Sequence, residues 1–159
     1  MNKQITKIIE TFKETYVKNP KNRTAIGHIA CYTSAKQKDG TFKHCPIGRY
    51  LLPKYQGRTW KYNGDGIRYI LRKEKISTID KFLLPEYNGI SLDFWKDIQQ
   101  LHDNHTLWTD EGLTEDGKHA LKKIEETNYS NEKSKPLVEE RKNVSDYVTL
   151  FKKHTSLDK

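Results

Sequence analysis

The sequence predicts a mainly helical α+β fold, in which several amphipathic helices pack around a small hairpin-like segment near the N-terminus. The helices are predicted because apolar side chains recur every three or four residues in separate stretches of the chain. The hairpin is predicted because Asp39 and Gly40 lie between two short apolar runs, as in a tight turn between strands. A chain of 159 residues is long enough to bury the core of one such domain.

The first helix is expected at residues 3–18. Its apolar side chains form one continuous stripe when they are placed on a helix, and Asn19-Pro20 ends it. The stripe consists of Ile5, Ile8, Ile9, Phe12 and Tyr16. Because the stripe is continuous and apolar, we assign it to the hydrophobic core and give it no chemical role.

The hairpin region follows, and it holds both cysteines of the chain. Residues 26–33 are expected to form a short extended segment, residues 38–40 a turn, and residues 42–45 a returning segment. A short helix is expected at 46–52. Pro46 suits the first position of a helix, and Pro53, directly after this range, stops it.

The remaining elements are expected within and after a basic, glycine-containing stretch at 54–75. Apolar spacing and the residues that cap helix N-termini indicate their positions. They are a short strand or helical turn at 67–71, a short helix from Ser77 or Thr78 to Leu84, a helix at 91–103 that Ser91 begins, and a helix that Thr114 begins.

A polar, turn-rich stretch near the C-terminus divides the chain into a domain and a tail. We expect a single globular domain at 1–128, a linker at 129–135, and a C-terminal helix or tail at 136–159. Apolar residues at helical spacing predict a helix at 136–154, which would dock on the domain or form a homodimer contact.

Composition limits the compartment in which the protein acts. Hydrophobic residues make up 34% of the chain, and no apolar run approaches the roughly 20 residues that span a bilayer. The N-terminus lacks the apolar centre of a signal peptide. A cytoplasmic protein without a membrane partner is therefore expected. In that compartment the two cysteines are expected to be free, buried thiols.

Charge is distributed unevenly along the chain, which carries a net +8. Residues 1–75 hold 17 Lys and Arg against 5 Asp and Glu, a net +12, whereas residues 76–159 hold 12 against 16, a net −4. This asymmetry predicts one basic face, which could attract nucleic acid, a nucleotide or an acidic protein. The alternative is a lysine-rich surface that serves only solubility.

The basic stretch at 54–75 is the candidate binding site, because Lys and Arg neutralise phosphates and aromatic rings stack on bases. Arg49, just before the stretch, could add a bidentate contact to a phosphate. The candidate ligand-binding residues are Arg49, Arg58, Trp60, Lys61, Tyr62, Arg68 and Arg72. The alternative is a solvated loop whose aromatic residues cover the core.

A second candidate site combines Cys45 with His102 and Asp103. A thiolate beside an imidazole that a carboxylate orients is the arrangement of a cysteine nucleophile. The three meet only if the helix at 91–103 packs on the Cys45 turn. Neighbouring side chains on a helix do not normally face each other, which argues against a pair between His102 and Asp103. The alternative is a buried histidine with a structural hydrogen bond.

No cofactor is predicted, with a zinc ion as the alternative. Zinc takes four nitrogen or sulfur ligands, usually from close pairs in the sequence. His102 and His105 form such a pair, and Cys31 and Cys45 would complete the set. The two cysteines are far apart in the sequence, however, and no Cys-x-x-Cys motif occurs.

Three short motifs follow one another in the chain. They are Cys31-Tyr32 before the Asp39-Gly40 turn, Cys45-Pro46-Ile47-Gly48-Arg49-Tyr50-Leu51, and Ile98-Gln99-Gln100-Leu101-His102-Asp103. Over residues 3–125 this arrangement resembles an uncharacterised family of small phage and bacterial proteins. The stretch at 54–75 departs from the family by its length and its positive charge. The resemblance implies a phage or mobile-element context, a location in the host cytoplasm, and the neutralising of a host factor.

These observations favour a non-enzymatic accessory protein that binds an anionic partner: nucleic acid, a nucleotide or a host protein. Two alternatives stay open. One is a cysteine-dependent enzyme that uses Cys45 and His102. The other is a protein–protein inhibitor or scaffold that dimerises through the helix at 136–154.

Overall fold

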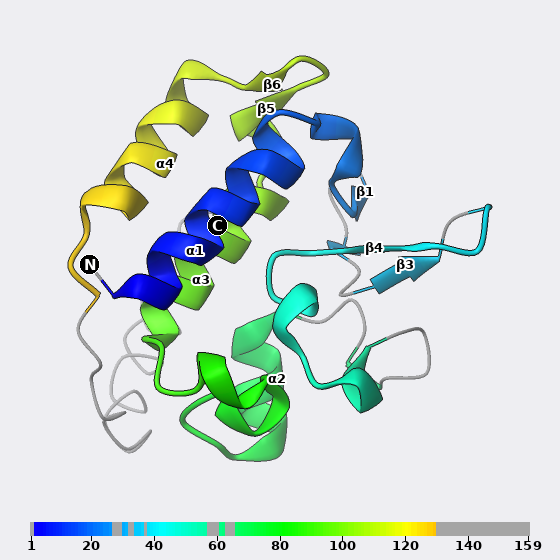
Figure 1. Ribbon diagram of the computed structural model, residues 1–159, viewed down its shortest axis with the longest axis vertical. Coiled ribbons are helices and arrows are strands. Elements are labelled where there is room, and N and C mark those ends of the chain that lie inside the picture. Colours follow the sequence, from blue (N-terminus) through cyan, green and yellow to red (C-terminus); the bar gives the residue numbers. More distant parts are fainter. Residues whose placement is uncertain are drawn as a thin grey trace, which may run out of the picture.

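The structure is a computed structural model, and it describes residues 2–26, 30–31, 34–36, 38–56, 61–62 and 66–129. These residues form a mainly helical α+β fold, as predicted. The α-helices are α1 (Lys3–Phe12), α2 (Ile67–Glu74), α3 (Leu92–Asp103) and α4 (Glu115–Glu126). Figure 1 shows α1, α3 and α4 running along a common diagonal, while α2 lies at one end of the longest axis. No helix in the described part of the chain has the length and apolar character needed to cross a bilayer.

The predicted first helix is confirmed, and its apolar stripe is buried as expected. Asn2 begins α1, because its side chain accepts a hydrogen bond of 2.8 Å from the Gln4 N–H. After Phe12 the helix continues as a π-helical turn at Lys13–Val17, in which the Lys18 N–H donates to the Lys13 carbonyl. The sequence had no signal for this wider turn, which carries Tyr16 into the core.

The described strands form three separate antiparallel pairs. They are β1 (Ala25–Ile26) with β2 (Ala30–Cys31), β3 (Ser34–Lys36) with β4 (Phe42–His44), and β5 (Trp108–Thr109) with β6 (Gly112–Leu113). The predicted turn at 38–40 and the returning segment at 42–45 are confirmed in the β3–β4 hairpin, but the first strand of this hairpin is Ser34–Lys36 and not the expected segment at 26–33, in which Ala30–Cys31 pairs with β1. The Asp39 carboxylate stabilises its turn by accepting from the N–H and the hydroxyl of Thr41, at 2.9 and 2.6 Å.

Two predicted short helices are wrong. The segment at 46–52 contains only a 3₁₀ turn, Gly48–Tyr50, and the segment at 77–84 contains only Asp80–Phe82. The reason is long-range backbone pairing, because Leu51 and Leu83 form an isolated antiparallel bridge. The Leu52 N–H donates to the Phe82 carbonyl, and the Leu84 N–H donates to the Tyr50 carbonyl, both at 2.8 Å. These bonds satisfy groups that a helix would otherwise have paired internally.

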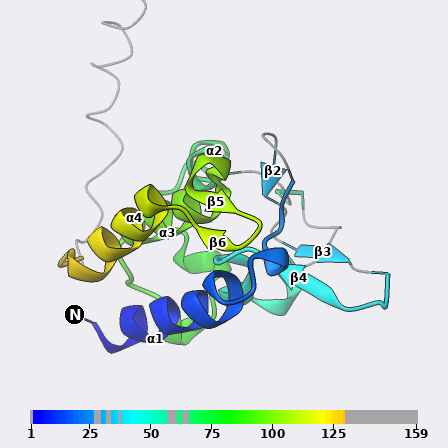
Figure 2. The ribbon, with the colours of Figure 1, turned by 90° about the horizontal axis from the view of Figure 1, so that it is seen from above.

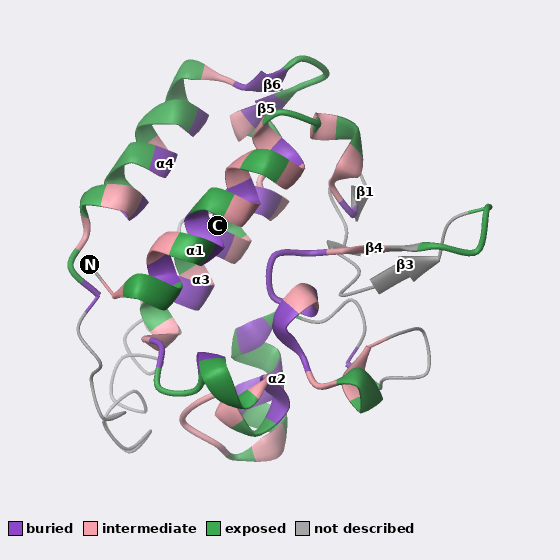
Figure 3. Cartoon of the chain, in the orientation of Figure 1, coloured by how far each residue is buried: buried purple, intermediate pink, exposed green. Residues whose placement is uncertain are grey.

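The core lies between α1, α3 and α4 and continues to the buried side of α2, and Figure 3 shows buried residues on the inner sides of these helices. Helix α3 is the most buried, because Phe94, Trp95 and Ile98 are fully enclosed. The predicted N-cap of α3 is confirmed, since the Ser91 hydroxyl accepts a hydrogen bond from the Asp93 N–H. Figure 2 shows the same helices from above, with α4 and α1 on the same side of the strands.

The core extends just past the predicted end of the domain at residue 128. The buried ring of Tyr129 packs edge-on against Phe94 with centroids 5.2 Å apart, and its hydroxyl donates to Asp97 at 2.8 Å. Tyr129 therefore belongs to the domain and not to the predicted linker. The rest of that linker and the predicted helix at 136–154 lie outside the described residues.

Gly117 in the first turn of α4 gives a test of this packing. A methyl group there would lie 2.3 Å from the Leu107 carbonyl oxygen and 2.8 Å from Leu113 Cδ2. We expect Gly117→Ala to destabilise the protein by about 1–3 kcal/mol, because overpacking outweighs the gain of about 1 kcal/mol in helix propensity. The measurement is the midpoint of urea denaturation.

Gly66→Ala is the matched control, since a methyl group at Gly66 meets nothing within 4 Å and its φ of −74° suits any residue. We expect its free energy of unfolding to stay within about 0.5 kcal/mol of the wild type. A Gly117→Ala protein as stable as the wild type would contradict the close approach of α4 to the 105–113 segment.

Candidate functional site

The exposed side of α2 collects the cationic residues of the basic stretch. Helix α2 forms because Ile67, Ile70 and Leu71 recur at helical spacing and are buried. Their burial turns the opposite side of the helix to solvent. We call this opposite side the α2 face, and it consists of Arg68, Tyr69, Arg72 and Lys73.

The helix that carries the α2 face ends abruptly at Lys75. This residue adopts the left-handed conformation, with φ 52° and ψ 43°. The Ile76 N–H then donates to the Leu71 carbonyl at 3.1 Å and closes the last turn. The sequence prediction left 67–71 open between a strand and a helical turn, and the structure shows a helix.

Tyr69 is the centre of the α2 face. Tyr69 is 38% exposed, and it is the large hydrophobic residue with the greatest exposure in the described part of the chain. The Arg72 guanidinium carbon lies 5.8 Å and the Lys73 Nζ 5.6 Å from the ring centroid, at cation–π distances. Within the described part of the chain, no carboxylate forms an ion pair with Arg68, Arg72 or Lys73. The face therefore presents an aromatic ring among cations whose charge no carboxylate of the described residues compensates through an ion pair.

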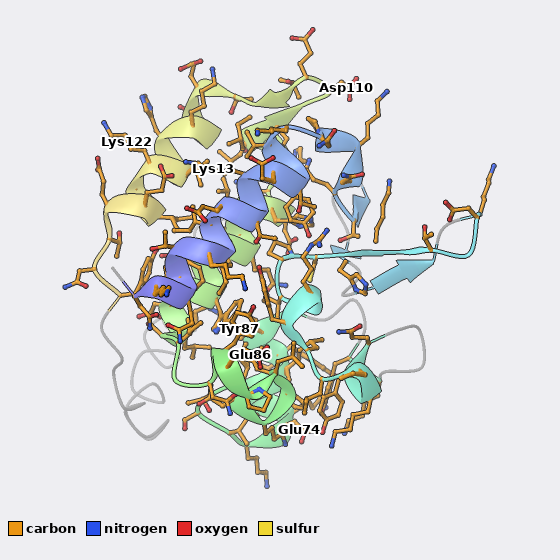
Figure 4. The ribbon with its side chains drawn as sticks, viewed as in Figure 1. Lys13, Glu74, Glu86, Tyr87, Asp110 and Lys122 are labelled. Atoms are coloured by element: carbon orange, nitrogen blue, oxygen red, sulfur yellow. The ribbon has the colours of Figure 1, made fainter. Side chains whose placement is uncertain are left out.

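Glu74, beside the α2 face, ties neighbouring segments to the helix. Its carboxylate accepts from Lys61 at 2.8 Å and Lys81 at 2.6 Å, and the Tyr62 hydroxyl also donates to it. These hydrogen bonds, first those from Lys61 and Lys81, lower the pKa of Glu74 from its ordinary 4.5 to about 2. Glu74 is thus an anionic anchor that holds α2 in place (Figure 4).

The predicted ligand-binding residues separate into groups in the structure. Arg68 and Arg72 lie on the α2 face. Lys61 is paired with Glu74, and Tyr62 is only 6% exposed with its ring edge-on to Phe82. The expectation that Tyr62 stacks on a base therefore needs correction, because its ring is part of the core. Arg58 and Trp60 lie outside the described residues.

Arg49 lies in a different environment from the α2 face. Its Nε donates to the Tyr16 hydroxyl at 3.2 Å, and its guanidinium carbon lies 5.6 Å from the centroid of that ring. The Tyr16 hydroxyl in turn donates to the His44 carbonyl. Tyr16 therefore connects the π-helical turn both to β4 and to Arg49 in the Gly48–Tyr50 turn.

Sequence reasoning missed Tyr69 and Lys73 as site residues. The signal was present, because Ile67, Ile70 and Leu71 define the buried side of a helix and leave both residues opposite it. It could be used only after 67–74 had been assigned to a helix.

His102 occupies a fully buried position at the end of α3, with 0% of its surface exposed. Its Nδ1 lies 2.8 Å from Asp103 Oδ1, and its Nε2 accepts from the Thr24 backbone N–H at 3.4 Å. Because Nε2 is the acceptor, the ring proton is on Nδ1. Burial lowers the pKa of His102 below 6.5, and the Asp103 carboxylate offsets this only in part, so the ring is neutral at pH 7.

The pair between His102 and Asp103 corrects one expectation. Adjacent residues in a helix do not normally face each other, but Asp103 is the last residue of α3, and its side chain folds back to the ring. The Tyr16 ring packs edge-on against the imidazole, with centroids 4.9 Å apart. The cluster therefore joins α3, the π-helical turn and the Thr24 backbone.

The carbonyl end of α3 is satisfied by side chains from distant segments. Arg23 donates to the His102 carbonyl from Nε at 3.0 Å and from Nη2 at 2.5 Å. Trp108 Nε1 donates to the Leu101 carbonyl at 2.7 Å, and the Arg23 guanidinium lies 4.5 Å from the Trp108 ring centroid. A cation at this position also suits the negative end of the helix dipole.

Cys45 is 2% exposed, and its Sγ accepts from the Gly48 N–H at 3.3 Å. No hydrogen bond joins Cys45 to His102 among the contacts of the described residues. The arrangement thus contains the histidine–carboxylate pair of the proposed enzyme, while the histidine nitrogen that would accept a thiol proton faces a backbone N–H. The geometry suits a structural cluster better than a nucleophile.

The residues of the alternative zinc site are not brought together as far as the structure describes them. No group of three or more His, Cys, Asp or Glu residues in the described part is placed to hold a metal ion. His105 is exposed, and the side chain of Cys31 lies outside the description. Zinc binding therefore stays an untested alternative to the prediction of no cofactor.

Nothing in the comparisons with known proteins assigns the chain to a family: no family model, curated protein or solved structure matches it. The resemblance to small phage and bacterial proteins, based on the Cys31-Tyr32, 45–51 and 98–103 motifs, stays a prediction. Function is therefore inferred from the α2 face and from the cluster around His102.

The anchoring role of Glu74 predicts a specific acid dependence. Its folded pKa of about 2 lies below the ordinary 4.5, so its stabilising contribution is present above pH 4.5 and is lost as the pH falls toward 2. We expect Glu74→Gln to be less stable than the wild type at neutral pH, with the difference shrinking through this range. Denaturation at a series of pH values measures it. A difference that does not change with pH would contradict the anchor.

The burial of Cys45 predicts protection from alkylation. We expect iodoacetamide to modify Cys45 in the folded protein only as fast as the protein unfolds, because the thiolate must be exposed to react. Peptide mass mapping separates Cys45 from Cys31, and denatured protein is the control. Rapid, selective modification of Cys45 at neutral pH would instead support the cysteine enzyme.

Proposed function

We propose that this protein is a non-enzymatic binding protein that holds the phosphate backbone of nucleic acid on the α2 face. The observation that carries this proposal is the exposed Tyr69 among Arg68, Arg72 and Lys73, three cations that form an ion pair with no carboxylate in the described part of the chain. Such cations release condensed counterions from phosphates when they bind, which supplies affinity without any need for a pocket.

The shape of the α2 face favours a polymer over a free nucleotide. A small ligand is usually held in a concave pocket that covers most of its surface. The α2 face is instead an exposed helix surface, on which Arg68 and Arg72 lie one turn apart, about 6 Å along the helix axis. Cations in a row along a helix can contact several phosphates of one strand.

The charge distribution supports the same partner. Residues 1–75 carry a net +12, and residues 76–159 carry a net −4. Helix α2 belongs to the basic half of the sequence, and a local excess of positive charge raises the rate at which a polyanion associates.

The non-enzymatic part of the proposal rests on Cys45 and His102. The thiol is enclosed, and the imidazole nitrogen that would take its proton already accepts a backbone hydrogen bond. Both residues contribute to packing in this arrangement. The wider role of a phage or mobile-element accessory protein that neutralises a host factor is compatible with nucleic-acid binding, and it stays a prediction from the sequence.

Removal of two cations tests the proposal. We expect Arg68→Ala with Arg72→Ala to weaken binding to a fluorescent oligonucleotide and to reduce the slope of log K against log salt by about 1.4 for a single strand. Fluorescence anisotropy at several salt concentrations measures both quantities. Lys122→Ala with Lys123→Ala is the matched control, because it removes the same charge from exposed positions on α4.

An equal loss in both double variants would mean that binding depends on net charge and not on the α2 face. No binding of nucleic acid by the wild type, together with salt-dependent binding of an acidic polypeptide, would replace the proposal with an acidic protein partner.

A further inference from the structure

We infer that the α2 face recognises single-stranded nucleic acid, by stacking an unpaired base on the ring of Tyr69. This inference rests on the proposed function and adds the class of nucleic acid. It starts from the exposure of Tyr69, which contrasts with the burial of Tyr50, Tyr62 and Tyr87 in the same structure. More of Tyr69 than of these three residues reaches solvent, and it does so among the cations of the α2 face.

An exposed ring distinguishes single strands from duplexes on physical grounds. In a duplex the faces of the bases are stacked on one another, and a side chain reaches only base edges, sugars and phosphates. In a single strand the base faces are available, and stacking on an aromatic ring stabilises each such contact regardless of sequence. Tyr69 therefore contributes strongly to binding only when the bases are unpaired.

The cations are placed to hold the strand on either side of a base stacked on Tyr69. Arg68 precedes Tyr69 on the helix, whereas Arg72 and Lys73 follow one turn later and lie within 6 Å of its ring centroid, at 5.8 and 5.6 Å. A nucleotide stacked on the ring has a phosphate on each side along its strand. Cations on both sides of the ring along the helix can contact both phosphates.

The ring is also held on a rigid support. Helix α2 is fixed by the buried side chains of Ile67, Ile70 and Leu71, and by the bonds of Glu74 to Lys61, Lys81 and Tyr62. A tyrosine has only two side-chain torsions, so little conformational entropy is lost when a base stacks on it. The face is therefore organised before the ligand arrives.

The test compares one sequence of about 20 nucleotides as a single strand and as a duplex, with full-length wild type, Tyr69→Ala and Tyr69→Phe. We expect Tyr69→Ala to weaken single-strand binding about 5- to 150-fold and duplex binding less than about 2-fold. Tyr69→Phe keeps the ring and should bind as the wild type does. The salt dependence should be the same for all of them, because no phosphate contact is removed.

Equal weakening of both forms by Tyr69→Ala, or no weakening of the single strand, would overturn the inference. The Arg68→Ala and Arg72→Ala double variant separates this failure from that of the proposed function. If the double variant loses binding while Tyr69→Ala retains it, the α2 face binds phosphates without stacking. If the wild type binds neither form, the proposed function and the inference fail together. Circular dichroism confirms that each variant is folded.

Discussion

The fold depends on how the last carbonyl groups of α3 are paired inside the protein. These groups have no partners within the helix, and they cannot stay unpaired in a buried position. Arg23 and Trp108 donate to the carbonyls of His102 and Leu101, and the Arg23 guanidinium packs on the Trp108 ring. The neutral His102 side chain fills the remaining space beside Thr24. The segment around Arg23 and Thr24, before α3, and the segment around Trp108, after it, are thereby both fixed to the C-terminal end of α3.

Elements that follow local rules were predictable from the sequence. The stripe of α1 and the caps at Ser91 and Thr114 are short-range features, and the structure confirms them. The bridge between Leu51 and Leu83 could not be predicted, because it joins segments whose meeting is decided by the whole fold. The π-helical turn was also missed, since a wider helical turn has no distinct apolar spacing.

The candidate site was predicted only in part, because composition reveals its charge but not which side chains the tertiary structure buries. The basic character of the stretch around α2 is visible in composition, and Arg68 and Arg72 do lie on its exposed side. Tyr62 and Tyr69 look alike in the sequence, since each has a basic residue directly before it. Only the tertiary structure separates them, because Tyr62 packs against Phe82 while Tyr69 faces solvent.

The pairing at the end of α3 also governs the order in which the chain can fold during synthesis. Arg23 and the His102 carbonyl are 79 residues apart, and Lys13 and its partner Glu125 are 112 apart. A nascent chain that has released α1 from the ribosome must therefore wait for α3 and α4 before the apolar stripe is covered. Contacts between residues far apart in the sequence form slowly, and other proteins can bind the exposed stripe of α1 until they have formed. A chaperone could therefore bind the apolar stripe of α1 until α3 and α4 have been synthesised.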